Sequence, residues 1–342
     1  MSFRLSVLDQ SPIAEGATGA IALRNSIDLA QCAEQAGYHR YWVAEHHGTP
    51  MLACASPEVL IGAIAAATGR IRVGSGGVML PHYSPLKVAE TFSMLSALYP
   101  DRIDLAVGRA PGSDPLTAFA LQRDRRHPAP DDFPQQLVEL LAYLWDRMPA
   151  DHRFARLAAL PGRPERPEVW LLGSSPQSGE WAAELGLPYA FADFINPLGR
   201  AIAAHYREHF TPSINAAAQV TTAAWVLCAD TDEEAERLAS SSRMAFTLFL
   251  QGRLIPVPTV ETALDFLAQH PGSVEALGRR RRSIVGSPST VRAGIEALAA
   301  EYGADEVMIV TITYDHAARR RSYELIAKAL RMSRDTAART GD

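Results

Sequence analysis

The amino-acid sequence predicts an α/β protein with the architecture of a (β/α)8 TIM barrel. Three observations support this prediction: the chain has 342 residues, short apolar segments recur along it, and alanine-rich helical segments separate them. Barrels of this class run from about 200 to more than 400 residues. Alternation of strands and helices is typical of a parallel sheet that helices cover.

Eight apolar segments, most of them rich in β-branched residues, are the candidate strands. They span Phe3–Leu8, Tyr41–Ala44, Ile71–Val73, Ile103–Val107, Val169–Leu172, Tyr189–Phe191, Thr221–Leu227 and Glu306–Thr311. The helical segments include Ile21–Ala36, Pro57–Thr68, Pro85–Leu98, Phe133–Trp145, Ser178–Leu185, Asp232–Phe249 and His316–Arg331. Ser56 and Ser84 each precede a first-turn proline, and Gly37 and Gly186 follow helix ends, so these boundaries are well marked.

We expect a single domain over residues 1–333 and a polar tail over 334–342. Two segments interrupt the alternation. Residues 148–168 are a long connection, and residues 251–286, which follow the seventh strand, are expected to form a lid. A doubly wound open sheet is the alternative fold, but its GxGxxG fingerprint is missing because the third glycine would fall at Met79.

The composition favours a protein that binds a small molecule in the cytoplasm. With 47% hydrophobic and 21% charged residues, the chain can bury a sizeable core. A net charge of -5 without interleaved aromatic and basic residues argues against nucleic acid and anionic membrane as partners. The three cysteines have no CxxC spacing, and no signal peptide or apolar span is present, which indicates a reducing cytoplasm.

The stretch RIRVGSGGVMLPHY, residues 70–83, begins as a buried strand and then has glycine at three of four positions. Gly74, Gly76 and Gly77 weaken a sheet locally, because glycine has no side chain to pack and loses the most backbone freedom on folding. Such a break marks a bulge or a close approach to the backbone.

Active sites of barrels lie at the carboxyl ends of the strands, so the residues that follow each strand are the candidates. Gly173, Ser174, Ser175 and Ser178 lead into a helix whose N-terminus is suited to an anion; ordinary capping by the serines is the alternative. Arg109 follows the fourth strand and offers a planar cation suited to phosphate, with an ion pair to a carboxylate as the alternative.

His46 is the candidate for proton transfer, since its ordinary pKa near 6.5 suits an acid or a base around neutrality. A structural histidine is the alternative. A metal site is not expected, because Glu45-His46-His47 has no matching cluster elsewhere, and neither GxSxG nor a P-loop is present. The run Arg279–Arg282 is interpreted as a solvated loop or helix end, with contact to an anionic ligand as the alternative.

Four motifs in this order and spacing resemble the flavin-dependent luciferase-like monooxygenases, in particular their single-chain bacterial members: WVAEHH, IRVGSGGVMLPHYSPLKVAE, YPDRIDLAVGRAPGSDP and VWLLGSSPQSGEWAAELGLPYAFA. The resemblance implies a barrel that binds reduced FMN (FMNH2), which a separate NAD(P)H-dependent flavin reductase delivers. O2 then adds to the flavin, and a C4a-peroxyflavin oxidises a small organic substrate.

Carried over to this chain, the resemblance implies an active-site histidine at His46 and phosphate-binding positions at Arg109, Ser175 and Ser178. It also implies a non-proline cis peptide under the flavin ring, at Gly76–Gly77. Members of the family commonly pair through barrel helices, so a homodimer is expected.

The sequence departs from luciferase at two cofactor positions. Ser174 replaces a glutamate, and a second phosphate arginine is missing near Phe133. An F420-dependent hydride-transfer enzyme of the same fold and a non-catalytic partner subunit are the alternatives. The candidate substrate-pocket residues follow the third and sixth strands and are His82, Tyr83, Phe191 and Asp193.

Overall fold

The computed structural model describes residues 3–110, 112, 114–127, 131–157, 159–272 and 282–330. Among them, eight parallel strands form a closed ring in which β9 pairs with both β7 and β1, which confirms the (β/α)8 TIM barrel. The expected tail at 334–342 and the arginines Arg279–Arg281 lie outside the described residues. The barrel strands are β1 (Arg4–Asp9), β2 (Arg40–Val43), β3 (Arg72–Met79), β4 (Ile103–Gly108), β5 (Glu168–Gly173), β6 (Tyr189–Ala192), β7 (Val220–Cys228) and β9 (Glu306–Val310).

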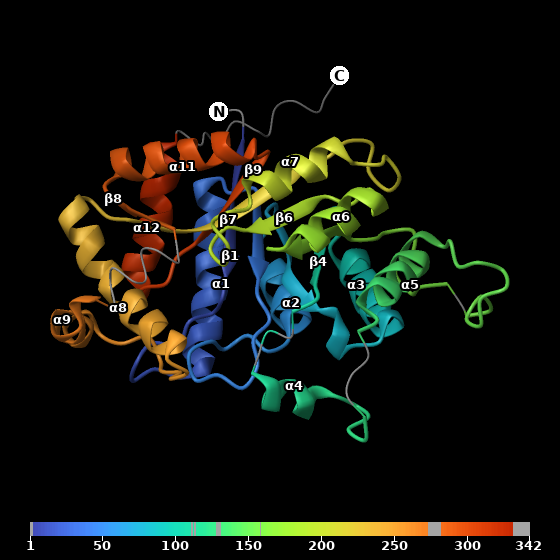
Figure 1. The fold of residues 1–342 in the computed structure, drawn as a ribbon, viewed down its shortest axis with the longest axis horizontal. Helices are drawn as coiled ribbons and strands as arrows, with labels where there is room; N and C mark the ends of the chain where they lie inside the picture. Colours follow the sequence, from blue (N-terminus) through green and yellow to red (C-terminus); the bar gives the residue numbers. More distant parts are fainter. Residues whose placement is uncertain are drawn as a thin grey trace.

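Helices follow the strands and cover the outside of the barrel (Figure 1). The segment between β4 and β5 contains both α4 and α5, and in Figure 1 α4 projects below the barrel. The helices are α1 (Gly19–Ala36), α2 (Pro57–Ala67), α3 (Pro85–Leu98), α4 (Pro115–Leu121), α5 (Phe133–Trp145), α6 (Pro176–Leu185), α7 (Arg200–Glu208), α8 (Asp232–Leu250), α9 (Val260–Gln269), α11 (Pro288–Tyr302) and α12 (His316–Ala329), with a 3-10 turn η1 (Leu80–His82).

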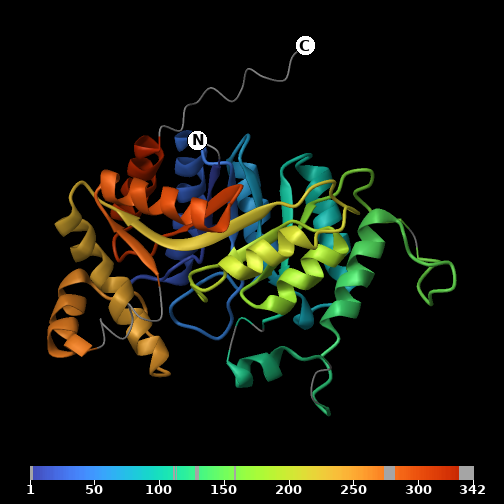
Figure 2. The ribbon, with the colours of Figure 1, turned by 45° about the horizontal axis from the view of Figure 1, so that its top comes forward.

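The expected lid has more regular structure than the sequence indicated. It contains α9, which packs beside α8 at the edge of the barrel (Figure 2), and the short strand β8 (Ser283–Gly286). β8 is a ninth parallel strand that pairs with Trp225–Cys228 at the end of β7. Four residues are too few to show a strand period, which is why the sequence did not distinguish β8 from a loop.

Side chains of the strands divide into two apolar layers, because successive residues of a strand point to opposite faces. The outer layer lies between barrel and helices and contains Val73, Leu105 and Ile309. The inner layer fills the barrel and includes Trp42 and Trp170, whose rings meet edge to face at 5.5 Å. A filled interior leaves room for a ligand only at the ends of the barrel.

We refer to the end formed by the amino ends of the strands as the floor and to the opposite end as the mouth. At the floor, Arg40 is 2% exposed and its Nη1 lies 2.8 Å from Oδ2 of Asp104. Its Nε donates to Glu306 at 3.1 Å, and its guanidinium lies 4.7 Å from the ring centroid of Trp170. Arg72 pairs with the other oxygen of Asp104. Burial opposes ionisation of Asp104, but Arg40 and Arg72 lower the pKa of this carboxyl.

Candidate active site at the mouth

The glycines of β3 lie where the strand approaches its neighbours most closely. The register against β4 shifts between Gly76 and Val78, so Gly77 forms a β-bulge, and the Gly76–Gly77 peptide bond is cis. A Cβ at Gly76 would lie 2.5 Å from Leu8 Cδ1, and a Cβ at Gly77 would lie 2.7 Å from the carbonyl oxygen of Ala106. The interior packing of the barrel itself therefore requires both glycines.

His46 follows β2 and is half-buried. Its backbone N–H donates to the carbonyl of Cys54 at 2.9 Å, which fixes the chain at this position. Nδ1 of the ring is buried and has no hydrogen-bond partner in the described part of the chain. Burial, with a smaller contribution from the neighbouring His47, lowers the pKa of His46 to about 4. The imidazole is therefore neutral near pH 7, and Nδ1 is an available polar atom.

Glu45, which the sequence suggested only as part of a doubtful metal motif, is fully buried beside His46. Its carboxylate accepts the Tyr83 hydroxyl at 3.0 Å and bonds Nε2 of His47 at 2.7 Å. Burial and Glu45 raise the pKa of Tyr83. The His47 ring meets the His82 ring edge to face at 5.9 Å. His82 and Tyr83 follow β3 at the mouth, and the hydroxyl of Tyr83 is directed to Glu45.

Arg109 follows β4 and is exposed. Its guanidinium lies 5.5 Å from the ring centroid of Trp181 on α6, and it has no ion-pair partner among the described residues. The sequence left an ion pair open as the ordinary role of Arg109, and the described contacts do not include one. Within the described residues this cation therefore has no counter-ion, and it stands beside the helix whose N-terminus is either an anion site or an ordinary serine-capped end.

The amino end of α6 is open on its first turn. Ser175 is the N-cap residue but makes no side-chain cap bond, and Pro176 occupies the first helical position. Ser178 is 7% exposed, donates to the Ser175 carbonyl at 2.7 Å and lies 2.9 Å from the Tyr189 hydroxyl. Gly173 packs against Ser178, and the Ser174 carbonyl accepts Asn196 Nδ2 at 2.9 Å. The Ser175 hydroxyl makes one long contact, 3.4 Å to the Ser178 hydroxyl, whereas Ser178 has two shorter bonds.

Phe191 and Asp193, which the sequence suggested as substrate-pocket residues, both contact Tyr302 of α11. Phe191 is fully buried in the outer layer and packs against Tyr302 of α11 at 5.5 Å between ring centroids. Asp193 is also fully buried and accepts the Tyr302 hydroxyl at 2.8 Å. Strand parity explains this result, because Phe191 shares its face with Tyr189 while Ala190 points inward.

Arg282, the described member of the arginine run, packs near Asp193. It forms an ion pair with Glu301 at 2.6 Å, donates to the Pro197 carbonyl at 3.3 Å and lies 3.8 Å from Asp193. Burial raises the pKa of Asp193 despite the Tyr302 hydrogen bond. Arg282 thus joins the base of the lid to the segment after β6.

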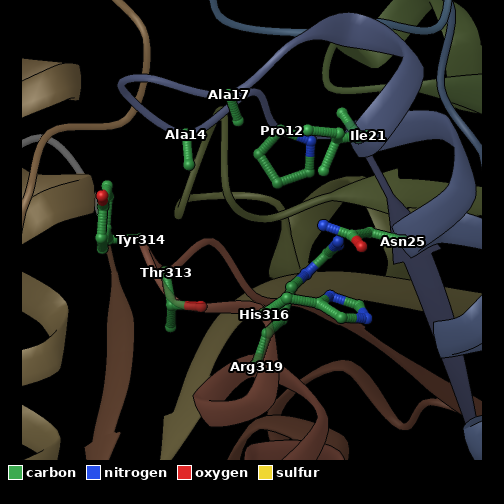
Figure 3. A pocket seen from close by; sticks show the side chains of 10 residues that line it. Pro12, Ala14, Ala17, Ile21, Asn25, Thr313, Tyr314, His316 and Arg319 are labelled. Atoms are coloured by element: carbon green, nitrogen blue, oxygen red, sulfur yellow. The ribbon is translucent and has the colours of Figure 1, made fainter.

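A small pocket lies at the mouth between the segments that follow β1 and β9 (Figure 3). Figure 3 shows the Arg319 side chain reaching toward Asn25, below the apolar side formed by Pro12 and Ile21. Arg319 pairs with the buried Asp9 at 2.6 Å, so its charge is compensated. The segment expected to form a lid contacts this side, since Val257 forms a β-bridge with Ala14. In the ring of strands, β9 and β1 lie opposite β4 and β5. Asp9 and Arg319 therefore lie on the opposite side of the mouth from Arg109.

Among the described residues, no three His, Cys, Asp or Glu side chains gather in a group that could hold a metal ion. In the same part of the chain, every helix is too short or too polar to cross a membrane.

Comparison with known proteins identifies close relatives over nearly the whole chain. A family model described as luciferase-like monooxygenase matches residues 1–306. A luciferase-like monooxygenase of Escherichia coli K12 is 42% identical over 327 residues, which cover 94% of this chain and 95% of that protein. The N-acetyl-S-alkylcysteine monooxygenase of Bacillus subtilis 168 is 39% identical over 330 residues, with coverage of 96% and 98%.

Solved structures agree with these matches. The crystal structure of apo-MsnO8 has a TM-score of 0.88 and 41% identity, and the alignment covers 97% of this chain and 99% of that chain. A second structure is an FMN complex of the oxygenating constituent of 3,6-diketocamphane monooxygenase from Pseudomonas putida. It has 22% identity and a TM-score of 0.73, and the alignment covers 96% of this chain and 98% of that chain. An F420-dependent secondary alcohol dehydrogenase has 16% identity and a TM-score of 0.67, with coverage of 96% and 99%. The last two likenesses concern the fold alone.

Proposed function

The chain belongs to the luciferase-like monooxygenase family, and from that premise we propose that it is an FMN-dependent monooxygenase that oxidises a small organic substrate. Bound reduced FMN supplies two electrons, so that one atom of O2 enters the substrate and the other leaves as water. The observation that carries the proposal is the unpartnered, buried Nδ1 of His46 at the end of the barrel where Arg109 and the open end of α6 also lie.

The residues at the mouth fit the phosphate of FMN. Arg109 brings a cation without a counter-ion in the described structure, and the first turn of α6 presents backbone N–H groups beside the Ser175 hydroxyl, whose recorded contact is a long one of 3.4 Å to Ser178. A helix N-terminus and an arginine fork both favour a phosphate dianion. We assign phosphate binding to Arg109, Ser175 and this turn. We expect Gly173, Ser174 and Ser178 to stabilise this turn on the side away from the phosphate.

The centre of the mouth suits the flavin ring and the oxygen chemistry. Gly76, Gly77 and Leu172 form a small-residue and apolar surface there, which limits access of water. His46 is neutral at pH 7, so its Nδ1 can accept a proton or a hydrogen bond from a bound group. We assign proton transfer or positioning of the reactive centre to His46.

Binding of reduced FMN is the first test. Anaerobic titrations that follow flavin fluorescence should show tighter binding of FMNH2 than of oxidised FMN and no saturable binding of reduced F420. Saturable binding of reduced F420 without FMNH2 binding would favour the F420-dependent alternative. Failure to bind either cofactor would contradict the proposed function and favour the non-catalytic subunit.

Oxygen transfer is the second test. One relative is named for the oxidation of an N-acetyl-S-alkylcysteine and is 39% identical, so N-acetyl-S-methylcysteine is the first probe substrate. With FMN, NADH, an NADH-dependent flavin reductase and 18O2, mass spectrometry should detect one 18O atom per oxidised thioether. The enzyme without reductase should give no product, because reduced flavin is supplied by a partner in this proposal. Analytical ultracentrifugation tests the proposed homodimer separately.

A further inference from the structure

Glu45 gathers hydrogen-bond donors from two neighbouring strand ends. Its Oε1 accepts the Tyr83 hydroxyl at 3.0 Å and bonds Nε2 of His47 at 2.7 Å, while its Oε2 accepts the backbone N–H of Met79 at 2.9 Å. The side chain is fully buried, and none of the described lysines or arginines forms an ion pair with it. These hydrogen bonds therefore provide most of the stabilisation of the buried Glu45 carboxylate.

The three donors connect the two segments that the proposed function uses. His47 is the neighbour of His46, and Met79 ends β3 two residues after the bulge at Gly77. The sheet pairing between β2 and β3 covers only Arg40 to Val43 of β2. Beyond it, the hydrogen bonds of the Glu45 side chain connect the end of β2 to the end of β3. His46 lies beyond that pairing, where the sheet no longer fixes it.

We propose that Glu45 is a positioning residue of this active site: it holds the end of β2 against the end of β3, and thereby fixes His46 relative to Gly76–Gly77. It acts through these residues and need not touch substrate. The role in oxygen chemistry rests on the proposed function, whereas the attachment of the strand ends does not.

Glu45→Gln is the informative variant, because it keeps the size of the side chain but provides only one accepting oxygen. With that oxygen toward Met79, the amide N–H groups face the hydroxyl of Tyr83 and Nε2 of His47. With the opposite orientation, the amide N–H group meets the N–H of Met79. Either way the acceptor of the Met79 N–H loses its negative charge, and a charge-assisted hydrogen bond is roughly twice as strong as a neutral one. Tyr83→Phe removes a single donor and should have a smaller effect.

Hydrogen exchange tests the attachment without any cofactor. In Glu45→Gln the Met79 amide should exchange at least tenfold faster than in the wild type, while the amides of β9 keep their rates. Glu306→Gln is the matched control, since Glu306 is another buried carboxylate but lies at the floor. That control should leave exchange at Met79 unchanged even if it lowers the melting temperature.

Stopped-flow reoxidation of bound FMNH2 in aerated buffer tests the catalytic consequence at a temperature where all variants are folded. The dissociation constant of FMNH2 should change less than threefold in Glu45→Gln, whereas the reoxidation rate of bound flavin should shift at least fivefold toward that of free FMNH2. Glu45→Asp should recover part of the wild-type rate. Wild-type exchange at Met79 together with wild-type reoxidation in Glu45→Gln would overturn the inference. Absence of FMNH2 binding in the wild type would instead refute the proposed function.

Discussion

The two ends of the barrel differ in the partners of Arg40 at the floor and of His46 and Arg109 at the mouth. At the floor, Arg40 is shared by Asp104 and Glu306, and Arg72 completes the pairing of Asp104. At the mouth, among the residues that the structure describes, Nδ1 of His46 is buried without a partner and Arg109 contacts the face of Trp181 but forms no ion pair. A network of paired charges stabilises the fold, whereas an unsatisfied group gains most from a ligand. The comparison therefore predicts that floor variants affect stability and that mouth variants affect binding and turnover.

Arg40→Met should have the largest effect. It leaves Asp104 and Glu306 buried without their shared cation, which costs about 3–5 kcal/mol when one partner of a buried pair is removed. Urea denaturation measures the loss in the free energy of unfolding. The dissociation constant of FMNH2 for the folded variant should stay within about twofold of the wild type. A loss below about 1 kcal/mol would remove the distinction between floor and mouth.

His46→Ala should show the reverse pattern. Turnover of N-acetyl-S-methylcysteine should fall about 100-fold or more, because a proton-transfer group is lost. The free energy of unfolding should change by no more than about 1 kcal/mol, since Nδ1 has no hydrogen bond to lose. Unchanged turnover would exclude His46 from the chemistry, and His46→Gln shows whether any polar atom suffices.

Arg109→Ala should weaken FMNH2 binding about 10-fold to 100-fold, as expected when a charged hydrogen bond to phosphate is removed. The anaerobic fluorescence titration measures this change. Arg126→Ala is the control, because Arg126 is 83% exposed and pairs with Asp124 on the surface. Equal affinities for both variants would place the phosphate elsewhere.

The pKa of His46 predicts a stability change with pH. It is about 4 in the folded protein against 6.5 ordinarily, so between these values the unfolded chain binds a proton that the folded chain does not. The contribution of His46 to the free energy of unfolding is thus complete above pH 6.5. It is lost as the pH falls toward 4, and the loss is on the order of 1–3 kcal/mol. The difference in unfolding free energy between wild type and His46→Gln, measured at pH 7 and at pH 4.5, isolates this contribution. A difference that does not vary with pH would mean that His46 titrates normally.

Ser175→Ala should have the smallest effect on stability, less than about 0.5 kcal/mol, because this N-cap residue makes no cap bond. Thr231→Ala, which loses a cap bond to the Glu234 N–H, should cost about 1 kcal/mol in the same denaturation assay. A few-fold increase in the FMNH2 dissociation constant for Ser175→Ala alone would assign the hydroxyl to the ligand. A stability loss as large as that of Thr231→Ala would assign it to the helix.

The fold could be predicted from sequence because each barrel strand is an apolar segment followed by a marked helix start. The positions of His46, Arg109 and Ser175 followed from the same regularity, since residues after parallel strands share one end of a barrel. The outward orientation of Phe191 could not be predicted, because a residue at a strand end can point to either face and its parity depends on where β6 begins. Glu45 was missed because its partners Met79 and Tyr83 lie 34 and 38 residues away. A local sequence pattern does not predict hydrogen bonds between residues that lie so far apart in the chain.

The glycine pair at the bulge limits how this end of the barrel can be redesigned. Replacing Gly76 would require room from Leu8 and Trp42, and replacing Gly77 would require room from Leu172 and the backbone at Ala106. These neighbours belong to four other strands, so a side chain at either position would need compensating changes in several strands at once. A mutant library that reshapes the mouth should therefore keep both glycines and vary the residues that follow the strands.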